Sequence, residues 1–246
     1  MLVAGFWGAV SASALLLGAL LALAPAIHRW LVARHEWRLG LLMAFGAGVL
    51  VSAVAFDLFE EAVNTSANGL DVAIGFAAGA ITFYVGDELL DRLVTRSGVA
   101  ADDGASPLGI MLGAILDGIP ESVVIGISLL AGESVSVAVV AAVFLSNIPE
   151  AISSTPGLAA RWGARFTLAA WGGVVAASAL AAALGYSLLG GAPPWLTIGL
   201  QAFAAGAILV MLTDEMIPGA HAKGHTAAGL ATALGFAVAA LLSFGS

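Results

Sequence analysis

Two copies of an Ile-Pro-Glu motif lie in the middle of apolar stretches that are long enough to cross a lipid bilayer. The first copy is Ile119-Pro120-Glu121 and the second is Ile148-Pro149-Glu150. A charged side chain at the centre of a membrane helix costs roughly 2.5–3.5 kcal/mol on insertion scales, and such residues usually face the interior of the bundle. Each copy therefore carries a cost in folding free energy, and binding of a cation to the carboxylates is the simplest explanation for their presence.

The composition is typical of integral membrane proteins. Hydrophobic residues make up 61% and charged residues 10% of the 246 residues, and the mean hydropathy is +1.04, far from the values of an ordinary soluble domain. The chain has no cysteine, so any metal that it handles must be bound by oxygen or imidazole. Many of the acids behind the net charge of −8 lie within apolar runs, and we expect them to line an internal site.

Eight apolar stretches have the length of about 20 residues that a helix needs to cross a bilayer. They cover residues 2–27, 39–63, 71–91, 107–131, 134–158, 166–190, 194–217 and 226–245. The first stretch is longer than the core of a signal peptide and no basic residue precedes it, so we expect a retained helix. The predicted fold is an all-α integral membrane protein with eight transmembrane helices, forming a single domain over residues 1–246.

The basic residues support this count and orient the chain. All eight fall in the connections after the first, third, fifth and seventh stretches: Arg29, Arg34, Arg38, Arg92, Arg96, Arg161, Arg165 and Lys223. Cytoplasmic loops are rich in Lys and Arg, so these connections should lie in the cytoplasm. We therefore expect a multi-pass protein of the plasma membrane with both termini outside.

The second and seventh stretches resemble each other, as do the fourth and fifth with their shared Ile-Pro-Glu. Residues 44–48 read Ala-Phe-Gly-Ala-Gly and residues 202–206 read Ala-Phe-Ala-Ala-Gly, and acids follow each run. The paired helices would cross the membrane in opposite directions, which indicates an inverted repeat with a transport site near the midplane. For the second and seventh stretches alone, the general use of small residues in membrane helix packing is an equally good explanation.

Five oxygen-bearing side chains can converge at the two motifs. Asp117 and Glu121 are four residues apart and share a helix face, as do Ser146 and Glu150, and Asn147 lies one turn from Glu150. Each proline also frees a carbonyl one turn back, which is tolerated at membrane depth only where protein or water satisfies it. These residues form a candidate cation site.

The carboxylates of this site need an explanation other than pairing within the protein. No Lys, Arg or His lies in the interior of an expected span, so a structural ion pair is the weaker interpretation. Carboxylates held close together at low dielectric repel one another, so the empty site should hold at least one proton. A divalent ion would displace that proton, and we expect proton-linked metal movement.

Other acids lie near the ends of the expected helices. Asp57, Glu60 and Glu61 approach the outer end of the second helix. A funnel through which cations enter and ordinary solvated charges explain these three equally well. Asp214, in the seventh helix, is open to the same two interpretations.

The inner ends of the third and seventh helices carry further polar residues. Glu215 and His221 could form an exit path, although histidines in loops are usually only solvated. Asp87, Glu88 and Asp91 lie next to basic residues, and we expect them to be interfacial charges rather than functional ones.

These motifs resemble those of the ZIP family of zinc- and iron-type divalent metal transporters. The resemblance covers nearly the whole chain: eight helices, both ends outside, the Pro-Glu motifs, and Asp-Glu-Met-Ile-Pro at 214–218, which is similar to the family's Asp-Glu-Leu-Ile-Pro-Glu. It implies metal ligation by Asp117, Glu121, Asn147 and Glu150, with Ser146 as a weaker candidate. It also implies a homodimer.

The chain departs from the family pattern at several positions. The fourth-helix motif is usually His-Asn-x-Pro-Glu-Gly and here reads Asp-Gly-Ile-Pro-Glu-Ser at 117–122, while the fifth-helix motif, which usually opens with His or Gln, opens here with Ser146. Gly118 replaces an Asn of the family's second metal site, the sixth helix has no acid, and Gly219 replaces a Glu. We therefore expect one central metal. Its ligands would all be oxygen atoms, which favours manganese, iron(II) or magnesium over zinc, although zinc also binds carboxylates well.

Two other functions fit the sequence less well. A membrane scaffold without transport would leave the paired Pro-Glu motifs unexplained. An intramembrane aspartyl protease is disfavoured because residues 84–87 read Tyr-Val-Gly-Asp, without the first glycine of a Gly-x-Gly-Asp motif. We expect a carrier rather than an enzyme, with a divalent metal ion as its substrate, the lipid bilayer around it, no prosthetic group and no nucleic-acid partner.

Overall fold

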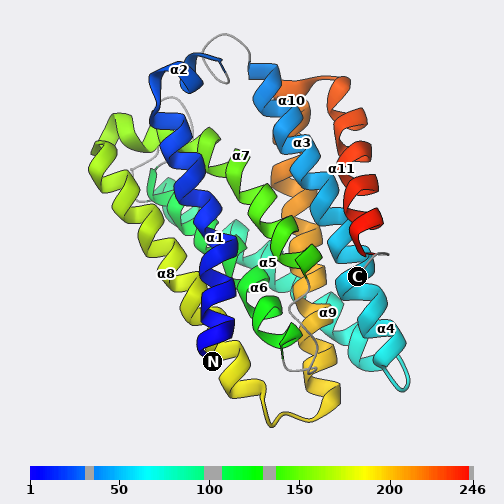
Figure 1. Ribbon diagram of the computed structural model, residues 1–246. Coiled ribbons are helices and arrows are strands. Elements are labelled where there is room, and N and C mark those ends of the chain that lie inside the picture. Colours follow the sequence, from blue (N-terminus) through cyan, green and yellow to red (C-terminus); the bar gives the residue numbers. More distant parts are fainter. Residues whose placement is uncertain (31–35, 97–106, 130–136, 244–246) are drawn as a thin grey trace.

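The computed structural model describes residues 1–30, 36–96, 107–129 and 137–243, and the regular elements in these ranges are all helices (Figure 1). The elements are α1 (Leu2–Leu23), α2 (Pro25–His28), α3 (Glu36–Ser52), the π-helical η2 (Ala53–Glu60), α4 (Glu61–Thr65), α5 (Leu70–Arg96), α6 (Pro107–Ser128), α7 (Val137–Trp162), α8 (Ala164–Leu189), α9 (Pro194–Met211), the π-helical η3 (Leu212–Met216), α10 (Ile217–Gly224) and α11 (Ala227–Ser243). Arg34, His35 and the expected span ends at 130–131, 134–136 and 244–245 lie outside the described residues.

Each expected apolar stretch corresponds to one helix or to one run of consecutive helical segments. Five helical stretches of the described chain are long and apolar enough to cross a membrane: Leu2–Leu23, Glu36–Thr65, Leu70–Leu93, Ala164–Leu189 and Pro194–Gly224. The helices α6 and α7 carry the polar motifs, and α11 is shorter, with 17 residues. The protein is thus a helical membrane protein, and its eight crossings stay a prediction.

Successive long helices run antiparallel, which gives the bundle two distinct ends (Figure 1). We name the end at which α2, α5, α7 and α10 finish the basic end. It carries the basic residues whose side chains are described: Arg29, Arg38, Arg92, Arg161, Arg165 and Lys223. The other end, where α1 begins, is named the distal end.

The helices pack in two groups. The motif group consists of α1, α6, α7 and α8: α1 packs against α7 and α8, and α6 packs against α8. The flanking group consists of α3, α5, α9 and α11 with the short segments that continue them: α5 packs against α9, and both α11 and α10 pack against α3. The two groups meet where α3 contacts α7 and where α6 contacts α9.

Glycines allow the helices of the flanking group to approach closely. In each of four contacts between these helices, a Cβ on the glycine would collide with a backbone carbonyl oxygen of the other helix. The contacts are Gly48 with Thr232, Gly235 with Phe45, Gly206 with Phe76 and Gly79 with Phe203. Small residues of this kind let membrane helices gain van der Waals contact along their backbones, and here they join α3 closely to α11 and α5 closely to α9.

Candidate metal site

An acidic cavity of about 580 Å³ opens among the helices in the half of the bundle nearer the basic end. It lies between the two groups, with walls from α6 and α7 on one side and from α3, α5, α9 and η3 on the other. Seven of the residues that line it carry carboxylates: Asp87, Asp91, Asp117, Glu121, Glu150, Asp214 and Glu215. This concentration of negative charge favours the accumulation of cations.

The two Ile-Pro-Glu motifs meet at this cavity. Both α6 and α7 continue through their motif prolines, so the spacing of four residues keeps Asp117 with Glu121, and Ser146 with Glu150, on one helix face each. All four of these residues line the cavity. The carboxyl group of Glu121 and the hydroxyl group of Ser146 are deeply placed, because these residues are only 4% and 3% exposed.

One oxygen of the site has no partner in the described part of the protein. The Oδ1 atom of Asp117 is buried and accepts no hydrogen bond there. A buried carboxylate oxygen without a partner is costly. The hydroxyl of Ser146, by contrast, donates to the Val143 carbonyl at 2.9 Å, which leaves the lone pairs of its oxygen as acceptors. A cation in the cavity would satisfy the Asp117 oxygen.

The site residues share a cavity without forming a compact cluster. Among the described residues, no three His, Cys, Asp or Glu side chains are close enough together to hold a metal ion. Direct ligation of one ion by all the motif carboxylates therefore requires the cavity to tighten, or water molecules to complete the ion's shell. Hard divalent ions commonly keep some of their water when proteins bind them.

Asn147 is separated from the other motif residues. It is buried, with 7% of its surface exposed, but it is not among the residues that line the cavity. Of the two predicted exit residues, Glu215 lines the cavity, whereas His221 is exposed on α10 and lies outside the lining. Asp214, which the sequence left open between an entry funnel and a solvated charge, also lines the cavity. The structure therefore brings together four of the five predicted ligands and one of the two predicted exit residues.

Two acids near the end of α5 have a different position from the one we expected. Asp87 and Asp91 line the cavity, although the sequence suggested interfacial charges. The interfacial interpretation fits Glu88. Its Oε1 accepts a 2.7 Å hydrogen bond from Arg92 Nε, and the two side chains form an exposed ion pair. The spacing of four residues between Asp87 and Asp91 was the available signal, because it places both on one face of the helix.

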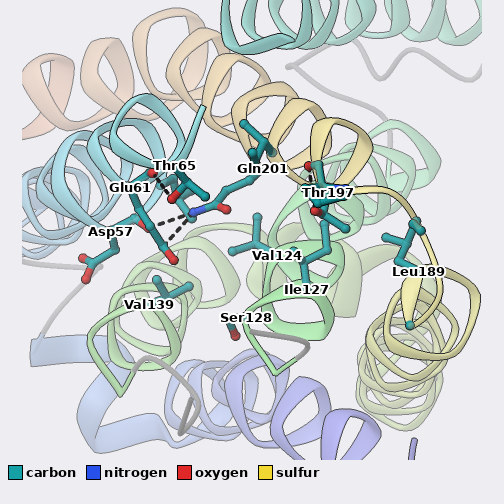
Figure 2. Close-up of a pocket in the computed structure, with 15 residues that line it drawn as sticks. Asp57, Glu61, Thr65, Val124, Ile127, Ser128, Val139, Leu189, Thr197 and Gln201 are labelled. Atoms are coloured by element: carbon teal, nitrogen blue, oxygen red, sulfur yellow. Dashed lines mark hydrogen bonds between the residues drawn. The ribbon is translucent and has the colours of Figure 1, made fainter. Parts of the chain in front are cut away.

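A second, smaller pocket of about 260 Å³ lies near the distal end (Figure 2). Across this distal pocket, Gln201 Nε2 donates to Glu61 Oε2 at 2.7 Å and to the Asp57 carbonyl at 3.3 Å. The Asp57 carboxylate points away from both residues (Figure 2) and accepts a 2.9 Å hydrogen bond from Ser243 Oγ. Asp57 and Glu61 thus line the pocket, whereas Glu60 is exposed outside it.

Buried apolar side chains separate the acidic cavity from the distal pocket. One continuous cluster reaches the lining of the distal pocket through Leu58, Val124 and Val139, and the lining of the acidic cavity through Met211. We name this cluster the apolar seal. The candidate site is therefore open toward the basic end and closed toward the distal end.

Compared with protein-family models and with curated proteins, the chain gives no match. The site is a carboxylate-lined cavity, open at one end, inside a helical membrane protein.

Proposed function

We propose that the protein is a secondary transporter that carries a divalent metal cation through the acidic cavity between α6 and α7. The observation that supports this most is the enclosure of the motif carboxylates in a cavity without a basic partner: Glu121 is buried, and Asp117 and Glu150 are half-buried. In the described chain no ion pair joins Asp117, Glu121 or Glu150 to a Lys, Arg or His, and one Asp117 oxygen has no hydrogen-bond partner. Intramembrane acids of this kind mark ion pathways.

The available ligands suit a hard divalent cation. Carboxylate and hydroxyl oxygens are the ligands of magnesium and manganese in proteins, and zinc and iron(II) also accept carboxylates. Gly118, the residue after Asp117, supports a single central ion. A Cβ on Gly118 would lie 3.4 Å from Ser178 Oγ of α8. This position therefore faces a hydroxyl group and not a carboxylate.

An inverted repeat, which many carriers contain, is supported by the glycine contacts. Gly48 and Gly206 are 158 positions apart, as are Phe45 and Phe203, while Phe76 and Thr232 are 156 positions apart, as are Gly79 and Gly235. With these two offsets, the two α3–α11 contacts coincide with the Gly206–Phe76 and Gly79–Phe203 contacts between α9 and α5. The proposed repeat exchanges α3 with α9 and α7 with α6, and the equivalent pairs are both in contact: α3 with α7, and α9 with α6.

The π-helical segments follow the same relation. The first, η2, begins five residues after Gly48 and carries Asp57, and the second, η3, begins six residues after Gly206 and carries Asp214 and Glu215. Such segments are rare and are frequent at functional sites. Their equivalent positions are consistent with two copies of one structural unit.

A carrier with this architecture has to expose its site to each side in turn. Cytoplasmic loops are rich in Lys and Arg, so the basic end should lie in the cytoplasm. The described arrangement, in which the cavity opens at that end, is then the state that faces the cytoplasm. Movement of one helix bundle against another around the site is the usual route to the opposite state. Here the motif group would move against the flanking group, and the apolar seal would open.

Uptake into proteoliposomes tests the proposal. Manganese and zinc, offered separately and in competition, should cross in the unmodified protein, and Glu121→Gln and Glu150→Gln should abolish the flux. Glu88→Gln is the matched control, because Glu88 is exposed and paired with Arg92. Normal flux in both cavity variants would contradict the proposal and favour a membrane scaffold without transport.

A further inference from the structure

A lysine at the basic end connects the two helix groups. Lys223 lies in α10 of the flanking group, and its Nζ donates to Ser153 Oγ of α7, in the motif group, at 2.8 Å. The sulfur of Met43 in α3 lies 3.9 Å from the same nitrogen. Ser153 and Met43 both line the acidic cavity, so the ammonium group stands at the cavity wall.

The backbone of Lys223 is held firmly on the flanking group. A Cβ on Gly40 of α3 would collide with the backbone of Gly224, the residue after Lys223. One turn earlier, a Cβ on Gly219 would lie 3.1 Å from Met43 Cε. Because α10 is packed against α3 in this way, Lys223 cannot follow α7 when α7 moves. Movement of α7 must break the bond to Ser153.

Three other side-chain hydrogen bonds between described helices each lie within one group. Trp171 Nε1 donates to Thr155 Oγ1 at 3.0 Å inside the motif group. The bonds from Gln201 to Glu61 and from Ser243 to Asp57 lie inside the flanking group. These bonds can persist while the groups move as units, whereas the Lys223–Ser153 bond cannot.

The hydrogen-bond acceptor of Lys223 is the neutral hydroxyl of Ser153, so the bond is weaker than an ion pair with a carboxylate would be. In the described chain no ion pair joins Lys223 to a carboxylate, although Ser153 follows Glu150 by one helical turn. A hydrogen bond that involves a charged group changes an equilibrium by about tenfold to a hundredfold. That is enough to favour one state of a carrier without preventing the other.

We infer that Lys223 is a positioning residue that holds the motif group in the state whose acidic cavity opens at the basic end. The bond to Ser153 has to break before the site can open at the distal end and has to form again on return. This inference rests on the proposed transport function, since it gives the role of one residue in the transport cycle.

A single introduced cysteine can report the state of the seal, because the chain has none of its own. Val124 is 2% exposed and belongs both to the apolar seal and to the lining of the distal pocket. In the Val124→Cys protein, purified in detergent without metal, reaction with a charged thiol reagent should speed up about tenfold on Lys223→Met. Ser153→Ala should have the same effect, and the two changes together should add little more.

Two further variants make the test specific. Ser154→Ala is the matched control, because Ser154 also lines the cavity but donates to the Glu150 carbonyl of its own helix at 2.5 Å. It should leave the labelling rate unchanged. Lys223→Arg keeps a charged donor and should return the rate toward that of the parent protein. Should Lys223→Met fail to fold, as judged by size-exclusion chromatography, Ser153→Ala supplies the test alone.

Unchanged labelling in the Lys223→Met and Ser153→Ala proteins would overturn the inference, and so would an equal increase in Ser154→Ala. The labelling needs no metal, so its result is independent of the transport assay. Loss of flux in Glu121→Gln with unchanged labelling in Lys223→Met would refute the role of Lys223 alone. Faster labelling in a protein that carries no metal would refute the transport function alone.

Discussion

Gln201 and Glu61 are joined by a 2.7 Å hydrogen bond across the distal pocket, and their counterparts in the proposed repeat are Met43 and Gly219 at the basic end. There, a Cβ on Gly219 would lie 3.1 Å from Met43 Cε. Within the flanking group, the distal end thus has a hydrogen bond to a carboxylate where the basic end has an apolar contact at the equivalent place. The two ends of this group are therefore chemically unlike at equivalent positions of the proposed repeat.

Replacing Gln201 with its repeat counterpart should destabilise the flanking group without shifting the equilibrium between the two states, because both partners of the bond lie in that group. Gln201→Met removes the donor to Glu61 while keeping a side chain of similar length, and we expect a loss of about 1 kcal/mol of stability. The unfolding temperature in detergent should fall, while the labelling rate of Val124→Cys should stay the same. Thr197→Val is the control, since Thr197 lines the same pocket but donates to the Pro194 carbonyl of its own helix. Faster labelling in Gln201→Met than in its parent would show that this bond does change between the two states.

Removing one motif carboxylate should weaken metal binding strongly. Glu121→Gln and Glu150→Gln each delete a charge from the cavity wall. We expect each to lower the metal affinity by at least about tenfold, because mutation of residues that only support metal ligands already has an effect of that size. Titration calorimetry with manganese on the purified protein measures this directly. Glu88→Gln should bind as the parent does, and a comparable loss there would point to nonspecific surface charge.

Ser146 and Asn147 should differ in their contribution to binding. Ser146 lines the acidic cavity and keeps acceptor lone pairs, whereas Asn147 lies outside the lining. Ser146→Ala should therefore lower manganese affinity more than Asn147→Ala in the same titration. The family resemblance favours the opposite order. A larger loss in Asn147→Ala would show that the site rearranges around the ion to recruit the amide.

The helix positions and the central carboxylates were predictable because both follow from local rules. Apolar length places a span, and the spacing of four residues places Asp117 beside Glu121 on α6 whatever the helix packs against. The spacing of Asp87 and Asp91 places them on one face of α5, but which helices that face meets, and the contact of Lys223 with α7, depend on how separate helices pack. Lys223 was expected in a loop after residue 217, but the helix continues through η3 and α10 to Gly224, so its ammonium reaches α7.

The glycines of the flanking group should be intolerant of even one added methyl group. Gly48→Ala places a Cβ against the Thr232 carbonyl, and Gly206→Ala places one against the Phe76 carbonyl. Overpacking of this kind costs about 1–3 kcal/mol, so both variants should unfold at a lower temperature in detergent. Gly173→Ala in α8, where an added Cβ meets nothing within 4 Å, should leave the temperature unchanged. Losses that differ widely between the first two variants would contradict their equivalence in the repeat.

Metal binding should release protons from the acidic cavity. The motif carboxylates line one cavity with no basic partner in the described chain, and such groups repel one another, so the empty site should hold at least one proton that a divalent ion displaces. Calorimetry in two buffers of different ionisation enthalpy counts the protons released for each manganese bound. In proteoliposomes, a pH dye should report an acidity change in step with flux. Flux that is indifferent to acidity between about pH 5 and 8, with no proton release on binding, would contradict the coupling, because carboxylates that exchange protons for metal must bind metal more weakly as acidity rises.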